Sequence, residues 1–244
     1  GVAWFDGEEF VLVPNSPRIE IRSLSEGPDG SVWIATAGDG IHRWTPREGI
    51  SRFGAERGIW EGHLNSIHAA QNGFIWYAQD LYVARIEPDR VVHTVVTASG
   101  DPGPGRDHSS RIISYAGGTT DDRLTTVTLS LAEARDGTLW TGTYAQGLLR
   151  YRDGVWTHFP SSPDAPFGAI LSVHVAPDGR LWCGTLSGAF VFDGDLWGLI
   201  DKRDGLAGNE VSSIRSDPDG TLWFGTDQGL TRYVPLRRAT KVDL

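Results

Sequence analysis

One stretch of the chain decides its fold: residues 219–233, which read Asp-Gly-Thr-Leu-Trp-Phe-Gly-Thr-Asp-Gln-Gly-Leu-Thr-Arg-Tyr. Its opening Asp219-Gly220 pair is the strongest short-range signal for a β-hairpin, because both residues tolerate the positive φ of a tight turn. The following strand contains Trp223 and ends in Gly225-Thr226, and a Gly-containing connection leads to the next strand. The stretch therefore predicts antiparallel strands inside a larger sheet.

The same turn followed by a tryptophan occurs five times along the chain. The five tryptophans are Trp33, Trp76, Trp140, Trp182 and Trp223, and successive ones are 43, 64, 42 and 41 residues apart. Each copy has an apolar stretch before its Asp-Gly or Asn-Gly turn and two further strands after the tryptophan, as at 147–151 and 155–159. Four antiparallel strands in a period of about 40–45 residues are typical of a β-propeller blade. The sequence therefore predicts an all-β propeller of about five blades.

Radial stacking of the blades follows from the two apolar faces of each sheet, since a single blade can bury neither face alone. The repeated tryptophans are therefore expected between neighbouring blades. A serine also lies seven residues before each turn glycine, and these serines are Ser23, Ser66, Ser130, Ser172 and Ser213. A small residue is expected where the innermost strands crowd around the axis. The alternative is that the serines line a functional channel.

We expect one domain over residues 1–244, since single all-β domains of this size are common. The predicted blade modules are 19–53, 63–96, 125–159, 169–201 and 211–235, with an N-terminal strand at 8–13 and a loop insertion at 97–124. Two arrangements are open: the N-terminal strand from Glu9 to Val13 completes the last blade and closes a ring, or the chain is part of a longer propeller. The closed ring is favoured because unpaired strand edges recruit other chains.

Composition excludes several classes of function. The chain has 22 Lys and Arg against 31 Asp and Glu, a net charge of -9, which argues against general nucleic-acid or anionic-membrane binding. The single cysteine, Cys183, excludes an internal disulfide, and no zinc-type histidine motif is present, so no metal or cofactor is predicted. No apolar run is long enough for a transmembrane helix. The chain begins at Gly1 without Met or a signal peptide, which predicts a processed or excised segment.

The repeat resembles a known family, the two-component regulator propeller repeat. The residues that carry the resemblance are Asn209, the strand 211–214 and the run from Asp219 to Tyr233. The copies at 136–151 and 178–192 match well, the first copy has Ala35 and Trp44 in place of Gly and Tyr, and the second is degenerate. The resemblance implies a sensor region of a bacterial signalling receptor, periplasmic or extracellular, joined to an output domain and often binding carbohydrate fragments.

Loops held by a rigid scaffold usually carry function. In a propeller, the loops before each first strand share a face with the connections between second and third strands. The long insertion at 97–124 is the outstanding loop, because loops of this length are generally functional or disordered. Arginine and histidine side chains can hold a carboxylate or polyol, and aromatic side chains can stack on a sugar ring. The candidate ligand-binding residues are Trp60, His63, Arg106, His108, Arg111, Tyr115, Tyr144 and Asp227. The alternatives are rim packing for Trp60, a mobile surface excursion or an extra strand around Arg111 to Tyr115 for the insertion, and solvated turns for the rest.

Three functions are compatible with these residues. The favoured one is a module that senses a small polar ligand such as an oligosaccharide. The second is a scaffold for protein–protein interaction, and the third is a propeller lyase or hydrolase in which a histidine such as His108 acts as base beside a carboxylate. His68 and His174 occupy equivalent places in two copies, five residues before the turn glycine, which indicates a structural role rather than a metal pair. No catalytic residue is predicted.

Overall fold

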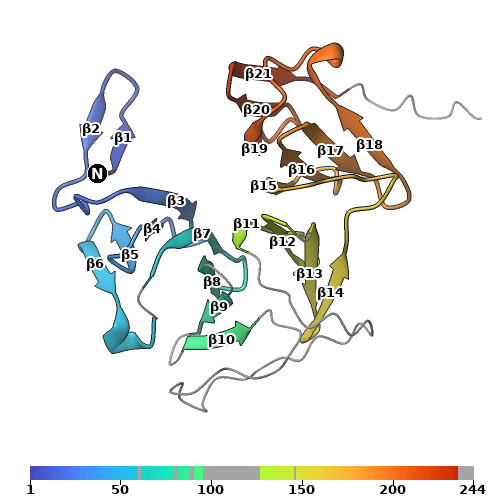
Figure 1. Ribbon diagram of the computed structural model, residues 1–244. Coiled ribbons are helices and arrows are strands. Elements are labelled where there is room, and N and C mark those ends of the chain that lie inside the picture. The colour runs from blue at the N-terminus through green and yellow to red at the C-terminus, as the bar shows by residue number, and fades with distance from the viewer. Residues whose placement is uncertain (60–61, 80–81, 88–90, 96–126, 146, 236–244) are drawn as a thin grey trace, which may run out of the picture.

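The structure is a computed structural model that describes residues 1–59, 62–79, 82–87, 91–95, 127–145 and 147–235 (Figure 1). Its described part is almost entirely β-structure, arranged as a β-propeller of five successive antiparallel blades, as the sequence predicts. Blades 1 and 2 consist of β3 (Ile21–Glu26), β4 (Val32–Thr36), β5 (Ile41–Thr45) and β6 (Gly49–Phe53), then β7 (Leu64–Ala69), β8 (Ile75–Gln79), β9 (Tyr82–Ile86) and β10 (Val91–Val95).

The remaining blades repeat this order. Blades 3 and 4 consist of β11 (Thr128–Glu133), β12 (Leu139–Thr143), β13 (Leu148–Arg152) and β14 (Val155–Phe159), then β15 (Ile170–Val175), β16 (Leu181–Thr185), β17 (Gly188–Phe192) and β18 (Trp197–Ile200). Blade 5 has three described strands, β19 (Val211–Ser216), β20 (Leu222–Thr226) and β21 (Gly229–Tyr233). The short 3₁₀ helices η1 (Ala55–Arg57) and η2 (Lys202–Asp204) precede blades 2 and 5, and β1 (Ala3–Phe5) and β2 (Phe10–Leu12) form an N-terminal hairpin. No described helix is long and apolar enough to cross a membrane.

Two side chains of the repeat motif hold its turns in place. The turn aspartate accepts a hydrogen bond at Oδ1 from the backbone N–H two residues later, as Asp219 does from Thr221 at 2.8 Å, and the turn glycine Gly220 has a φ of 89°. The threonine that ends the second strand closes the next connection, since Thr185 Oγ1 donates to the carbonyl oxygen of Gly188 at 2.9 Å. The same bond occurs at Thr36, Thr143 and Thr226. Capped turns of this kind explain why the motif keeps Asp-Gly and Gly-Thr.

The apolar core lies between the blades rather than in a single centre. Trp182 of blade 4 is fully buried and packs edge-to-face on Phe224 and Tyr233 of blade 5, with ring centroids 5.4 and 5.9 Å apart. Trp76 of blade 2 contacts Tyr151 of blade 3 in the same way. In the last blade Trp223 is only half-buried, and its indole N–H donates to Asp217 at 2.9 Å. Trp76 and Trp182 are therefore buried between neighbouring blades, whereas no described blade follows Trp223.

The repeated serines connect the innermost strands of adjacent blades. Ser23 Oγ accepts a hydrogen bond from the Ile67 N–H at 3.2 Å, Ser66 from Leu131 at 3.2 Å, and Ser130 from Val173 at 2.9 Å. Ser172 donates to the carbonyl oxygen of Val211 at 3.5 Å, whereas Ser213 on β19 of blade 5 is exposed. A serine suits this position because it is small enough for the crowded axis and still supplies an acceptor for a backbone N–H.

The described blades form an open arc instead of the expected closed ring (Figure 1). The prediction that the N-terminal strand completes the last blade is wrong in this structure, because β2 pairs with β1 and not with β21. The hairpin forms locally, since Phe5 and Phe10 face each other across the Asp6-Gly7 turn, whereas pairing with β21 would close a very long loop. Val2 and Val13, which flank the hairpin strands, are also buried against Ile34 of blade 1. This packing holds the hairpin on blade 1.

Candidate functional site

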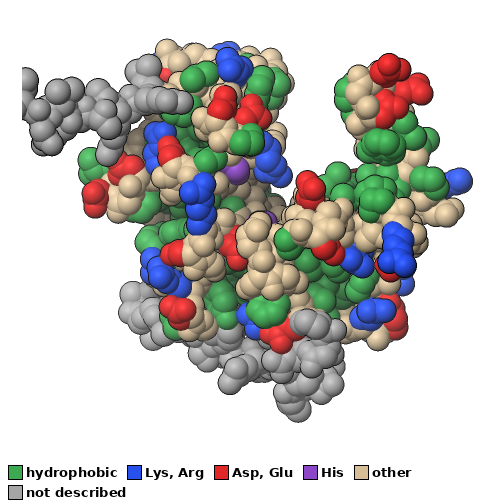
Figure 2. Space-filling model, turned by 180° about the vertical axis from the view of Figure 1, so that it is seen from behind, with side chains coloured by type: hydrophobic (Ala, Val, Ile, Leu, Met, Phe, Trp, Pro, Cys, Tyr) green, Lys and Arg blue, Asp and Glu red, His purple; other side chains and the backbone are tan. Residues whose placement is uncertain are grey.

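The innermost strands β3, β7, β11, β15 and β19 enclose an axial cavity of about 840 Å³. We use the name axial cavity for the space lined by these five strands. It opens on the side between the N-terminal hairpin and blade 5, where the space-filling view shows a deep hollow (Figure 2). A volume of this size lies in the range of small-molecule sites. All five repeated serines are among its lining residues. Four of them, Ser23, Ser66, Ser130 and Ser172, both contact the next blade and face the cavity.

Histidine side chains at equivalent places face this cavity. His68 Nε2 lies 3.4 Å from Glu133 Oε2 of the next blade, and the Glu133 side chain is only 9% exposed. The same carboxylate accepts a hydrogen bond from the Gln71 N–H at 3.2 Å. Two blades further on, His174 Nε2 lies 2.8 Å from Ser216 Oγ. Each histidine thus contacts the next blade, which agrees with the structural role that the sequence indicates.

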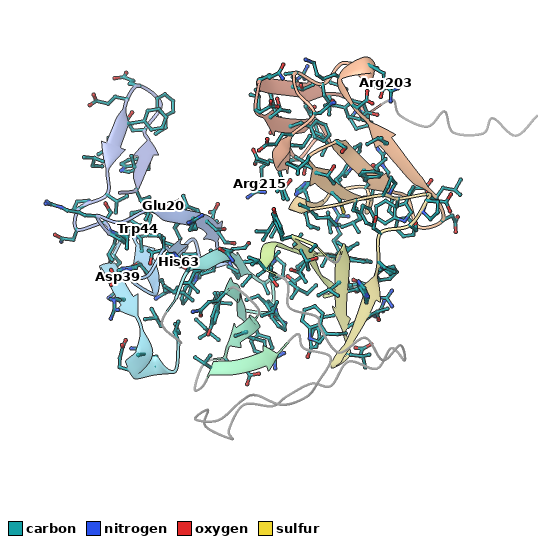
Figure 3. The ribbon with its side chains drawn as sticks, in the orientation of Figure 1. Glu20, Asp39, Trp44, His63, Arg203 and Arg215 are labelled. Carbon is teal, nitrogen blue, oxygen red and sulfur yellow. The ribbon has the colours of Figure 1, made fainter. Side chains whose placement is uncertain are left out.

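Burial controls the charge of His174. Loss of solvent, together with the neighbouring positive charge of Arg215, lowers the pKa of His174 from 6.5 to about 4. The imidazole is therefore neutral at neutral pH and pairs with the Ser216 hydroxyl as a hydrogen-bonding group. Arg215 projects from β19 into the open centre of the arc, where its side chain is exposed (Figure 3). This end of the cavity presents a cation beside neutral donors and acceptors.

The opposite side of the opening has charges of both signs. Arg22 on β3 also lines the cavity and pairs with Glu20 at 3.2 Å, and both side chains are well exposed. Hydroxyl, imidazole, guanidinium and carboxylate groups therefore surround one water-accessible space, and such groups hydrogen-bond to polyols. No cluster of three or more metal-binding side chains occurs among the described residues. The chemistry that the cavity offers is polar recognition.

The described loop candidates lie on separate blades. His63 is exposed just before blade 2, where it forms a β-bridge with Ala37, and Figure 3 shows it beneath β3. Tyr144 follows β12 and is 62% exposed, and Asp227 follows β20 and accepts a hydrogen bond from Gln228 at 3.2 Å. The N–H of Tyr144 donates to Val127 and that of Asp227 to Glu210, so each connection borders the segment before its own first strand. The axial cavity does not include His63, Tyr144 or Asp227 among its lining residues. The other candidates, Trp60, Arg106, His108, Arg111 and Tyr115, lie outside the described residues.

Sequence reasoning did not single out Arg22, Glu133 or Arg215 as cavity residues. The signal was available, because each lies on a predicted first strand at a fixed distance from a turn glycine. Polar residues on a strand expected to be innermost lie close to the axis or against the adjacent blade. Such residues deserved more weight as ligand contacts than residues in connecting loops.

The fold and the repeated contacts define the class of protein as a β-propeller of tryptophan-bearing blades. Within that class, a family model described as "Two component regulator propeller" matches residues 205–228, the segment that leads into blade 5 and includes β20. Residues 205–228 therefore match the two-component regulator propeller repeat that the motifs of the chain resemble. The comparison with curated proteins found no match.

Solved structures with a similar fold include proteins of different activities. The chain superposes on the extracellular domain of BT4673, described as a hybrid two component system of B. thetaiotaomicron, with a TM-score of 0.68 and 18% identity over 91% of this chain and 28% of that one. It also superposes on virginiamycin B lyase from Staphylococcus aureus, with a TM-score of 0.62 and 15% identity over 92% of this chain and 73% of the lyase. A gluconolactonase from Xanthomonas campestris gives a TM-score of 0.61 and 17% identity over 86% and 70% of the two chains.

These structural similarities establish the fold and no more. The chain spans 28% of the length of the BT4673 domain, and the similar structures include both a signalling protein and enzymes. One propeller scaffold commonly supports unrelated functions, so function has to be argued from the site.

Proposed function

We propose that this chain is a ligand-binding propeller module of a bacterial signalling receptor, acting outside the cytoplasm. The two-component regulator propeller repeat at residues 205–228 supports the signalling role. The extracellular location of the similar BT4673 domain is consistent with it. In such a receptor the module would bind a small polar molecule and pass the change to an attached output domain.

The observation that carries the ligand-binding role is the polar lining of the axial cavity. Arg22, His68, Glu133, His174 and Arg215 come one from each of the five blades and line the same space of about 840 Å³. A saccharide has neighbouring hydroxyl groups that both donate and accept hydrogen bonds, so this mixture of groups matches it better than an apolar or purely anionic ligand. An oligosaccharide is therefore the ligand class that we propose.

Isothermal titration calorimetry against a panel of neutral and acidic oligosaccharides tests this function. We expect saturable binding of at least one oligosaccharide and a loss of about tenfold in affinity in R215A, because a charge-assisted hydrogen bond is removed. R203A is the matched control, since Arg203 on η2 is 86% exposed and does not line the cavity. Absence of binding across the whole panel, or equal affinity in R215A and the native chain, contradicts the proposal.

A second candidate is a lyase or hydrolase activity at the same cavity. It is favoured by one contact, the 3.4 Å approach of His68 to the almost buried carboxylate of Glu133, because a carboxylate beside an imidazole can support a general base. Incubation of the binding oligosaccharide with native chain and with H68Q, followed by mass spectrometry, separates the two candidates. A product that forms with the native chain and not with H68Q would favour the enzyme.

A further inference from the structure

The interface between blades 1 and 2 differs from the equivalent interface between blades 3 and 4. Both begin with the same aromatic pair on the earlier blade: Trp33 and Phe53 have ring centroids 5.2 Å apart, and Trp140 and Phe159 have centroids 5.5 Å apart. The interplanar angles are also alike, at 52° and 46°. One wall of the two interfaces is therefore built in the same way.

The opposite wall carries smaller side chains in the first interface. On blade 4 the paired residues Phe192 and Trp197 stack with centroids 4.9 Å apart and fill the space. The residues at the equivalent paired positions of blade 2 are Ile86 and Val91. Phe167, in the segment before blade 4, adds a third ring in contact with Trp197.

A cavity of about 580 Å³ lies where these rings are missing. Trp33, Phe53, Ile59, Ile75, Ile86 and Val91 form its apolar wall. Protein interiors normally fill such space, because unfilled apolar volume weakens packing. It shares no lining residue with the axial cavity, so the two are separate sites. We call it the inter-blade pocket.

Charged residues of both signs surround the mouth of the inter-blade pocket, and nearly all have ionic partners. Arg43 contacts Asp29 at 2.8 Å, and hydrogen bonds from Ser31 together with Arg43 lower the pKa of Asp29 to about 2. Glu56 lies 3.8 Å from Arg52, and Glu87 is bonded to Arg85. Each of the three carboxylates at the mouth therefore has a guanidinium partner.

Arg57 differs from the other charged residues at the mouth. It is exposed, and its guanidinium lies 4.5 Å from the centre of the Phe53 ring. No ion pair to it occurs within the described part of the chain. A guanidinium held over an aromatic ring at a pocket entrance is well placed to bind an anionic group of a ligand.

We propose that the inter-blade pocket binds a small aromatic carboxylate, with its ring between the two apolar walls and its carboxylate on Arg57. The equivalent interface defines the shape, because aromatic rings occupy the corresponding space between blades 3 and 4. The guanidinium of Arg57, which forms no ion pair with another described residue, defines the charge. The proposal does not depend on the sensor role or on saccharide binding at the axial cavity.

Titration of the native chain with indole-3-acetate, observed by NMR of isoleucine methyl groups, tests the location directly. We expect saturable shifts of the methyl signals of Ile59, Ile75 and Ile86, and no shift of Ile170 or Ile214, which lie in other interfaces. Unshifted signals of the first three at millimolar ligand overturn the proposal, as do equal shifts of all five.

Two substitutions test the shape and the charge separately. V91W places an indole in the pocket and is expected to abolish binding, whereas V155W makes the same change at a position that is 46% exposed and should bind normally. R57Q is expected to weaken indole-3-acetate about tenfold and to leave indole-3-acetamide unchanged, since only the acid loses a charge-assisted bond. Full binding by a folded V91W, or an equal effect of R57Q on acid and amide, overturns the proposal. I86F serves as the second filling variant if V91W does not melt cooperatively.

Discussion

Replacing Ser66 by alanine tests whether the repeated serines hold the blades together. Ser66 Oγ accepts the Leu131 N–H of the next blade at 3.2 Å, and Ser66 is only 7% exposed. Alanine removes the acceptor and leaves a backbone donor with little access to water. A buried donor without a partner costs about 1–3 kcal/mol, so we expect the free energy of unfolding to fall by this amount.

Ser213 provides the matched control for this measurement. It occupies the same repeat position in blade 5, where its side chain is exposed and no described blade follows. We expect S213A to change the free energy of unfolding by less than about 0.5 kcal/mol, as surface substitutions usually do. Urea unfolding followed by circular dichroism gives both values, provided that the denaturant dependence m is unchanged. Equal losses in S66A and S213A would refute the role of these serines in joining blades.

Three further predictions concern the same blades. G184A should destabilise the chain by about 1–3 kcal/mol or prevent folding, because an added Cβ would lie 2.3 Å from the Val211 carbonyl oxygen. An added Cβ at the equivalent Gly225 meets nothing nearer than 3.4 Å, so G225A should be tolerated. Thermal melts of the two variants measure the difference. Stability should rise with pH between about 4 and 6.5, because unfolded His174 binds a proton in this range and the folded residue does not. The gain should be about 3 kcal/mol at most, and H174N should remove that slope in urea unfolding at a series of pH values. T185V should lower the free energy of unfolding in urea by about 1–2 kcal/mol, because the buried Thr185 hydroxyl donates to Gly188 and accepts from Ser187. T226V should lower it less, because the equivalent Thr226 is only half-buried.

The blade architecture could be predicted because each of its signals is local. Asp219 and Gly220 form their turn with Thr221, and Thr226 bonds to Gly229 three residues away. The period of these local signals then fixes how many sheets stack and where the tryptophans lie. The fold class follows from such short-range features without knowledge of any distant contact.

The ends of the arc could not be predicted in the same way. Whether Phe10 pairs with Phe5 or with a strand at the other end of the chain depends on a competition between a local turn and a distant edge. In the structure the local pairing is supplemented by burial of Val2 and Val13 on Ile34. Nothing in the pattern of the hairpin itself reveals that Ile34 would be its support.

In the candidate sites, too, local features could be predicted and contacts between distant residues could not. His68 and His174 share a repeat position, so a common structural environment was predictable from the sequence. The contact of His68 with Glu133 joins residues 65 positions apart and was not. The inter-blade pocket exists because Ile86 and Val91 occupy positions where blade 4 has aromatic residues. This was not predictable from the sequence, because it depends on the pairing of Val91 with Ile86 and on their packing against Trp33 and Phe53.

The serine contact between adjacent blades has an evolutionary consequence. Ser23, Ser66 and Ser130 each accept a main-chain N–H of the next blade, and Ser172 donates to a main-chain carbonyl oxygen. Nearly every amino acid supplies these groups, so the contact imposes little demand on the sequence of the neighbouring blade. A gene that duplicates, deletes or shuffles one repeat unit therefore produces a new junction that is already compatible. Diversification can then concentrate on the few variable positions between the units, such as those occupied by Ile86 and Val91, while the stacking chemistry is inherited unchanged.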